Sequence, residues 1–212
     1  YIDVRDALKK VCVEGLFMDE AELFDLRRSL DTIREIIRFI KSKDEAAFPQ
    51  MHALVANVMV YPAVIDKIDA VLNKQGKIKD NASPELARIR KELINAQQSI
   101  SRKMAAILKK AQSDGLVEAD VSISIRDGRA VIPVLSANKR RLPGIVHDES
   151  ASGKTSYIEP AEIVEINNEL RELGYAERRE LSRILTTVSS FIRSYLEELL
   201  YAYDFLGIID FI

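Results

Sequence analysis

The chain has 212 residues, of which 47% are hydrophobic and 30% charged, with 31 Lys and Arg against 33 Asp and Glu. This length suits one ordinary domain or two small ones, and the net charge of −2 means that any basic surface must be local. Eight Gly and six Pro are too few for a sheet-rich or a disordered protein, and a single cysteine excludes an intrachain disulfide or a multi-cysteine metal site. We expect a mostly helical protein of a reducing compartment, with Cys12 as a small buried hydrophobe.

The first 82 residues carry helical patterns. Residues 19–42 form the clearest one, because apolar residues recur at steps of three and four, and Asp19 with Glu22 is a capping-box pattern at its start. Shorter helices are predicted over 44–58 and 62–75, the second of them ended by Gly76. Together these segments predict a small helical bundle.

Two long helices are predicted next. Ser83-Pro84-Glu85 is a strong helix start, and the three-four rhythm that follows predicts a helix over 83–115. A second apolar stripe predicts a return helix over 161–200. Its phase slips by one position between Leu173 and Leu181, which predicts local unwinding of the seam between the paired helices.

Between these helices the apolar period changes from 3.6 to 2. Asp127-Gly128 is the favoured two-residue hairpin turn. Alternating residues around it and further on predict two hairpins over 116–160, with strands over 121–125, 130–135, 144–149 and 155–159. The expected fold is therefore mainly α (α+β): a helical bundle, and two long antiparallel helices that carry a small antiparallel sheet at their tip. A sheet in that position would suit contact with something distant.

No motif predicts catalysis. Gly153-Lys154-Thr155 resembles the end of a phosphate-binding loop, but the required glycine five residues earlier is Asp148, and the segment connects two strands. We interpret it as a hairpin turn. His147 is followed by Asp148 and Glu149, whose side chains alternate between the two faces of a strand, so a structural role is favoured over a metal site. The chain is expected to hold no catalytic residue, cofactor, metal site or membrane span.

The clearest local excess of positive charge lies in the predicted hairpins. Residues 126–141 hold five basic residues against Asp127, although 116–160 as a whole holds six basic and six acidic residues. Basic side chains on hairpin loops fit sequence-independent contact with phosphates, but they fit a solvated loop equally well. The candidates for such phosphate contact are Arg126, Arg129, Lys139, Arg140, Arg141 and Lys154.

Several motifs give the chain a family resemblance. RDGR-x-VIPV, GIVHDESASG followed by YIEP, and EINNEL resemble the middle of MutS-related proteins of the second bacterial branch, MutS-two, and the upstream DNASPELARIR is similar to the same family. The resemblance covers about residues 20 to 200. It implies a core domain over 1–82, an outgoing lever helix over 83–115, a clamp over 116–160, a return lever helix over 161–200, and the truncated start of a link to an ATPase domain over 201–212.

The resemblance implies a module, itself without catalysis, that binds branched or duplex DNA and restrains homologous recombination. Its parent would be a cytoplasmic bacterial homodimer with ATP and Mg in an ATPase domain outside this chain, and with a nuclease-like domain. An alternative is a ribosome-binding module that contacts ribosomal RNA or protein in the rescue of stalled or collided ribosomes. A third possibility is a scaffold for dimerisation only. The six basic residues are the transferred clamp candidates.

The last residues of the chain form an apolar run. We expect this run to leave apolar surface uncovered, where a following domain would pack. Its members are Phe205, Leu206, Ile208, Ile209, Phe211 and Ile212.

Overall fold

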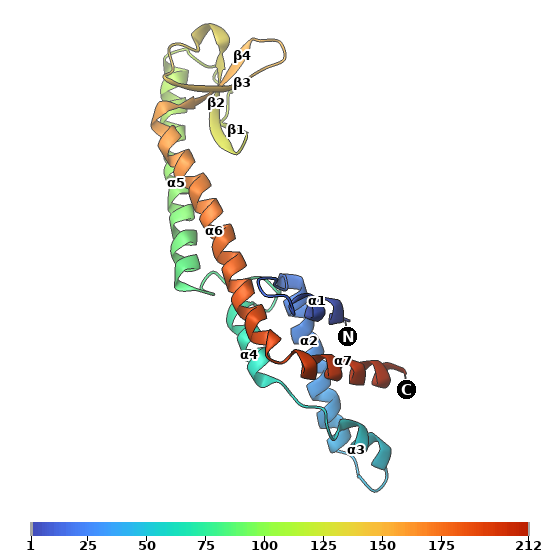
Figure 1. The fold of residues 1–212 in the computed structure, drawn as a ribbon. Helices are drawn as coiled ribbons and strands as arrows, with labels where there is room; N and C mark the ends of the chain where they lie inside the picture. The colour runs from blue at the N-terminus through green and yellow to red at the C-terminus, as the bar shows by residue number, and fades with distance from the viewer. Residues whose placement is uncertain (1, 212) are drawn as a thin grey trace. The chain divides into compact units, whose positions relative to one another are not determined.

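A computed structural model describes residues 2–211, with side chains as far as Asp210, and these residues divide into two compact units (Figure 1). The first unit comprises the chain up to Ala87 and the chain from Arg179 onward, and the second comprises Arg88–Arg178. The described residues are mainly helical with a small antiparallel sheet, which confirms the predicted fold class. No helix among residues 2–211 is long and apolar enough to cross a membrane.

Helix α2 forms the centre of the first unit. It begins at the predicted capping box, in which Asp19 Oδ1 accepts from the Glu22 N–H at 2.8 Å and Glu22 Oε2 accepts from the Asp19 N–H at 2.8 Å. Its apolar stripe is buried against the other helices of the unit. These are α1 (Arg5–Lys10), α2 (Glu20–Lys41), α3 (Pro49–Val55), α4 (Pro62–Val71) and α7 (Leu196–Phe211), with the start of α5 (Pro84–Ser113) and the end of α6 (Ala161–Arg193).

Helix α4 ends at Val71, four residues before the predicted end. Leu72 instead pairs with Ile78 across an isolated β-bridge. The carboxamide oxygen of Asn73 accepts hydrogen bonds from the N–H groups of Gln75 and Lys77 at 2.9 and 3.0 Å, which stabilises the turn between the bridged residues. The chain leaves the helix early because this local turn satisfies its backbone groups.

The helix predicted over 161–200 is two helices. Helix α6 ends at Arg193, and Ser194 and Tyr195 separate it from α7. The expectation of uncovered apolar surface is wrong for Phe205 and Leu206, which are buried in the hydrophobic core of the first unit. Ile208 is exposed and Ile209 packs partly against the core, while the side chains of residues 211 and 212 lie outside the described ones. The expectation that Cys12 is buried is also wrong, because its side chain is exposed.

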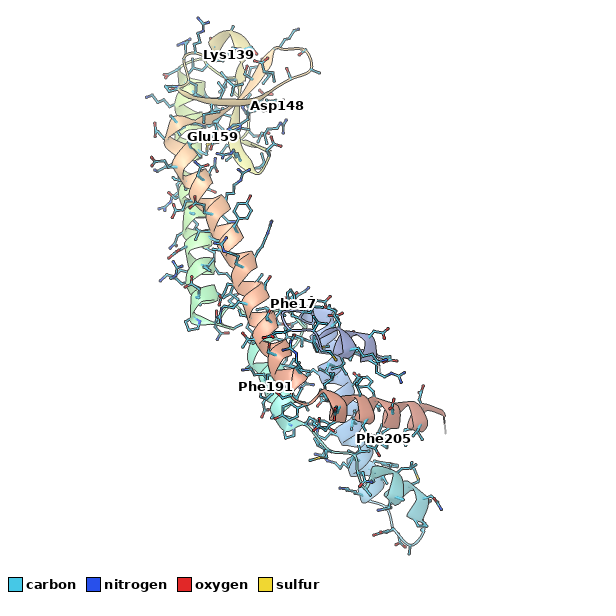
Figure 2. All side chains as sticks on the ribbon, viewed as in Figure 1. Phe17, Lys139, Asp148, Glu159, Phe191 and Phe205 are labelled. Carbon is cyan, nitrogen blue, oxygen red and sulfur yellow. The ribbon has the colours of Figure 1, made fainter. Side chains whose placement is uncertain are left out.

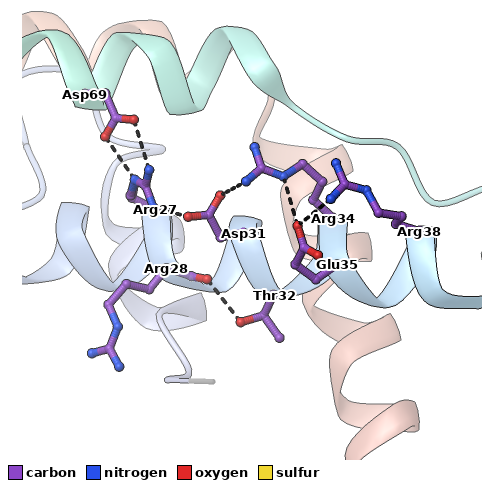
Figure 3. A network of polar contacts seen from close by, with 8 residues as sticks. All are labelled: Arg27, Arg28, Asp31, Thr32, Arg34, Glu35, Arg38 and Asp69. Carbon is purple, nitrogen blue, oxygen red and sulfur yellow. Dashed lines mark hydrogen bonds and ion pairs between the residues drawn. The ribbon is translucent and has the colours of Figure 1, made fainter.

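A chain of ion pairs follows one side of α2 (Figure 3). The Arg27 guanidinium donates to Asp69 of α4 at 2.9 Å and also pairs with Asp31 one turn further along α2. Asp31 in turn pairs with Arg34 at 2.7 Å. These side chains are partly exposed, so the pairs contribute little free energy each, and their main effect is to align α4 with α2.

Ser83 connects the start of α5 to α6 within the first unit. Its hydroxyl oxygen accepts from the Leu86 N–H at 3.0 Å, which confirms the predicted helix cap, and it donates to Glu180 Oε1 at 2.5 Å. The guanidinium of Arg183 donates to both carboxylate oxygens of Glu180, at 2.6 and 2.7 Å. The hydrogen bonds from Arg183 and then from Ser83 outweigh burial and lower the pKa of Glu180 to about 2.

This shift predicts that Glu180 stabilises the first unit only while it is ionised. The pKa of an unfolded glutamate is near 4.5, so the contribution is complete above that pH and is lost as the pH falls toward 2. The Glu180→Gln variant should be less stable than the parent at pH 7, and the gap should shrink as the pH falls from about 4.5 toward 2. Urea unfolding of both proteins across this range measures the gap, and a gap that is constant with pH would contradict the assignment.

The second unit contains the sheet and the parts of α5 and α6 that lie side by side next to it (Figure 1). The sheet packs where α5 ends and α6 begins, around a core that includes Met104, Ile132, Ile158 and Ile163. The strand order is β1-β2-β4-β3, and all pairs are antiparallel. The strands are β1 (Ser124–Arg126), β2 (Arg129–Leu135), β3 (Gly144–Glu149) and β4 (Thr155–Pro160), with a short 3-10 helix η1 (Ser136–Asn138) after β2.

Strands β1 and β2 form the predicted hairpin. Asp127 and Gly128 have φ values of 49° and 76°, as the favoured two-residue turn requires, and Arg126 pairs with Arg129. Strand β1 is shorter than predicted, because the residues before it bond to α5 instead. Gln112 Nε2 donates to the carbonyl oxygens of Ala119 and Val121 at 3.0 and 3.4 Å.

Candidate nucleic-acid interface

Strand β2 separates the six basic candidates into two groups. Arg126 and Arg129 lie at the β1–β2 turn, whereas Lys139, Arg140, Arg141 and Lys154 lie near the opposite end of β2. Arg129 begins the strand and Leu135 ends it, a strand length of about 20 Å at about 3.3 Å per residue. The six candidates therefore lie near both ends of β2 and do not form a single cluster.

Four of the six lie on two neighbouring loops, residues 136–143 after β2 and residues 150–154 between β3 and β4, which we call the basic loop pair. The Ser136 N–H donates to the Lys154 carbonyl oxygen at 2.9 Å and so joins the two loops. Lys139, labelled in Figure 2, reaches across to Glu149 at 3.0 Å. The four cations therefore lie on two adjacent loops that are joined by a backbone hydrogen bond.

The charges of the basic loop pair are only partly compensated. Lys139 pairs with Glu149, and its hydrogen bond is the main reason that the pKa of Glu149 lies below the ordinary value. Within residues 2–211, Arg140, Arg141 and Lys154 have no carboxylate within ion-pair distance, and all three are exposed. Their charges are free to meet an anion from outside.

The group at the β1–β2 turn is held inside the unit. The Arg126 guanidinium lies 4.0 Å from the ring centre of Tyr157, and its Nε lies 3.4 Å from Asp148 Oδ2. Arg129 donates to both oxygens of Glu159 at 2.8 and 2.9 Å, and only 16% of its side chain is exposed. Arg129 therefore has a structural task that competes with any contact to DNA.

Glu159, labelled in Figure 2, is a buried carboxylate with three side-chain partners in the second unit. Its side chain is 0% exposed, and besides Arg129 it accepts from Asn167 Nδ2 at 2.7 Å and meets His147 Nε2 at 2.5 Å. Burial favours the neutral acid, but the hydrogen bonds from Asn167, His147 and Arg129 outweigh it and lower the pKa of Glu159. The ionised carboxylate thus joins β2, β3 and β4 to α6.

Reasoning from the sequence assigned His147 a structural role but missed its partners. Glu159 lies in YIEP and Asn167 in EINNEL, so the motifs that carried the family resemblance also held the signal. In the part of the chain that the structure describes, no three His, Cys, Asp or Glu side chains are placed to hold a metal ion. What the exposed cations of the basic loop pair can make is an electrostatic contact with an anion such as phosphate.

Comparison with known proteins finds similarity to one segment of larger proteins. No protein-family model matches the chain. It is 34% identical over 212 residues to a protein of a Geobacillus species named Endonuclease MutS2, and 35% identical to proteins of the same name from Pelotomaculum thermopropionicum and Clostridioides difficile. Each match covers 99% of this chain and 26–27% of the relative, so the chain spans about a quarter of the length of these curated relatives. The resemblance seen in the motifs is confirmed as similarity to this segment of MutS2 proteins.

Proposed function

We propose that this chain is the core, lever and clamp segment of a MutS2-type protein, and that its basic loop pair grips the phosphate backbone of branched or duplex DNA. The observation that carries this proposal is the group of three exposed cations, Arg140, Arg141 and Lys154, which have no carboxylate partner among the residues that the structure describes. Cations on loops contact phosphates irrespective of base sequence. The contact is electrostatic, so the segment contributes grip rather than catalysis.

The parent protein belongs to the same proposal. It would be a cytoplasmic homodimer in which a separate domain binds ATP and Mg and a nuclease domain cuts DNA, and its hold on DNA would restrain recombination. The names of the relatives support the nuclease, since each is called an endonuclease. The segment described here would supply the surface that holds the nucleic acid.

The salt dependence of DNA binding tests the basic loop pair. In the variant with Arg140, Arg141 and Lys154 changed to Ala, three phosphate contacts are lost. Each contact contributes about 0.9 to the slope of log affinity against log salt concentration through counterion release, so the slope should become shallower by about 2.7. Fluorescence anisotropy with a blunt duplex at several salt concentrations measures the slope.

A matched control removes three exposed cations of the first unit, Lys9, Lys41 and Lys74, which changes the net charge equally. The control should keep the parental slope. If both variants change the slope equally, only net charge matters and the proposed surface is wrong. If the loop variant instead loses cosedimentation with ribosomes while its DNA affinity is unchanged, the ribosome is the target of these loops.

A further inference from the structure

A hollow lies between one face of α6 and the β1–β2 turn. Its helix side consists of residues spaced by three, one, three, one and three positions, which share one side of a helix. Residues 127–129 of the turn line the opposite side, and the hollow has a volume of about 290 Å³. The helix residues are Asn167, Leu170, Arg171, Gly174, Tyr175 and Arg178.

The hollow is electropositive. Arg129 lies in its lining but is matched by Glu159. Neither Arg171 nor Arg178 has a carboxylate within ion-pair distance among the described residues, and Asp127 is the single acidic group in the lining. Two uncompensated guanidinium groups therefore face one carboxylate. Guanidinium groups bind phosphate through paired N–H donors, so the hollow favours an anion of this kind.

Tyr175 adds an aromatic surface between the two arginines. Its side chain is 49% exposed, and the Arg178 guanidinium carbon lies 5.9 Å from its ring centre. The neighbouring Gly174 has no side chain, and a Cβ added there would have no atom within 4 Å, so space is open next to the ring. An exposed aromatic ring next to guanidinium groups is the combination that binds the base and the phosphate of a single-stranded nucleotide.

We propose that this hollow, lined by Arg171, Gly174, Tyr175 and Arg178, binds one unpaired nucleotide of a nucleic acid. Arg171 and Arg178 bind its phosphate and Tyr175 stacks on its base. The bases inside a duplex are already stacked on one another and cannot present a free face to Tyr175. The inference rests on the proposed grip on nucleic acid and adds to it a preference for sites that contain an unpaired strand, such as a tail or a branch.

The test compares two labelled ligands, a blunt DNA duplex and the same duplex with a five-nucleotide single-stranded tail, and measures the ratio of their affinities for the 212-residue chain. The parent chain should favour the tailed duplex. The Tyr175→Leu variant and the Arg171→Ser, Arg178→Ser double variant should each lower this ratio about tenfold, since base stacking and phosphate contacts have effects of this size. An RNA tail in place of the DNA tail shows which sugar is preferred.

Two further variants change the hollow without weakening the fold. Gly174→Leu fills the open space with a good helix former, so it should lower the ratio as far as Tyr175→Leu does. Asp127→Asn removes the opposing carboxylate and keeps a favoured turn sequence, so it should raise the ratio a few-fold. Circular dichroism of each variant checks that the helices are intact.

The outcomes separate this inference from the proposed function. If the parent binds both duplexes equally, or if the four variants leave the ratio unchanged, the hollow is not a nucleotide site, although the basic loop pair can still bind duplex. If neither duplex binds at any salt concentration, the proposed grip itself fails. A lower ratio in the Tyr175, Gly174 and double arginine variants, together with a higher ratio in Asp127→Asn, would support the inference.

Discussion

Replacing Glu159 by alanine should destabilise the second unit by about 3–5 kcal/mol, the usual cost of removing one partner of a buried ion pair. The variant leaves Arg129, His147 and Asn167 without the carboxylate that they share, whose side chain is 0% exposed. Glu159→Gln should cost less, because the amide oxygen still accepts one hydrogen bond. Hydrogen exchange of the β2 and β4 amides measures the local free energy of opening.

The matched control is Glu149→Ala. Glu149 also pairs with a cation, Lys139, but both side chains are more than 40% exposed. Water replaces an exposed partner at little cost, so this variant should leave the exchange rates of β2 and β4 nearly unchanged. Equal effects of the two alanine variants would show that Glu159 is not the residue that holds the second unit together.

A methyl group added at Gly144 should separate β3 from β4. The Cβ of Gly144→Ala would overlap the Glu159 carbonyl oxygen and lie 2.8 Å from a methyl carbon of Ile158, and the backbone cannot move aside as a flexible side chain can. Gly144 pairs with Pro160 at the start of β3, so the strain opens the pairing from that end. We expect a loss of about 3 kcal/mol or more, at the upper end of the cost of overpacking.

The control for Gly144 is the same substitution at Gly174, which lies inside α6. The added Cβ meets nothing within 4 Å there, so Gly174→Ala should stabilise the protein by about 0.5–1 kcal/mol through the helix propensity of alanine. Thermal unfolding of the two variants should therefore shift in opposite directions. A melting temperature lowered by both would mean that the space around Gly174 is not open.

Local features of the fold could be predicted from the sequence. The capping box at Asp19, the cap at Ser83 and the turn at Asp127-Gly128 each depend on residues that are close in the chain, and each formed as predicted. The bounds of β3 were predicted to the residue. Such features depend on local hydrogen bonds and on backbone conformations that only a few residue types favour.

Long-range features could not be predicted in the same way. Glu159 meets Arg129 from 30 residues away and His147 from 12, and no spacing rule relates positions on different strands. The division of the basic residues into two groups depends on β4 pairing with β2 rather than on charge pattern. The contacts of Glu159 and the division of the basic residues both depend on the order of the strands in the sheet.

The phase slip between Leu173 and Leu181 does not interrupt helix α6 itself. Helix α6 continues through it without a break, from Ala161 to Arg193. Ile163 and its neighbours pack in the core of the second unit, whereas Leu181 and the residues after it pack in the core of the first. The change of phase accompanies a change of packing partner, and the helix remains wound.

The outer strands of the sheet affect how this protein behaves in a crowded solution. Strands β1 and β3 are the outer strands of the sheet, and Ile145 and Val146 of β3 are 47% and 44% exposed. Outer strands with exposed apolar residues invite a strand from another molecule and so promote aggregation. β1 is only three residues long, and the register of β3 shifts between Val146 and Asp148, which interrupts its hydrogen-bonding pattern just before two acidic residues. The irregular, charged margin of the sheet therefore protects each molecule from the next.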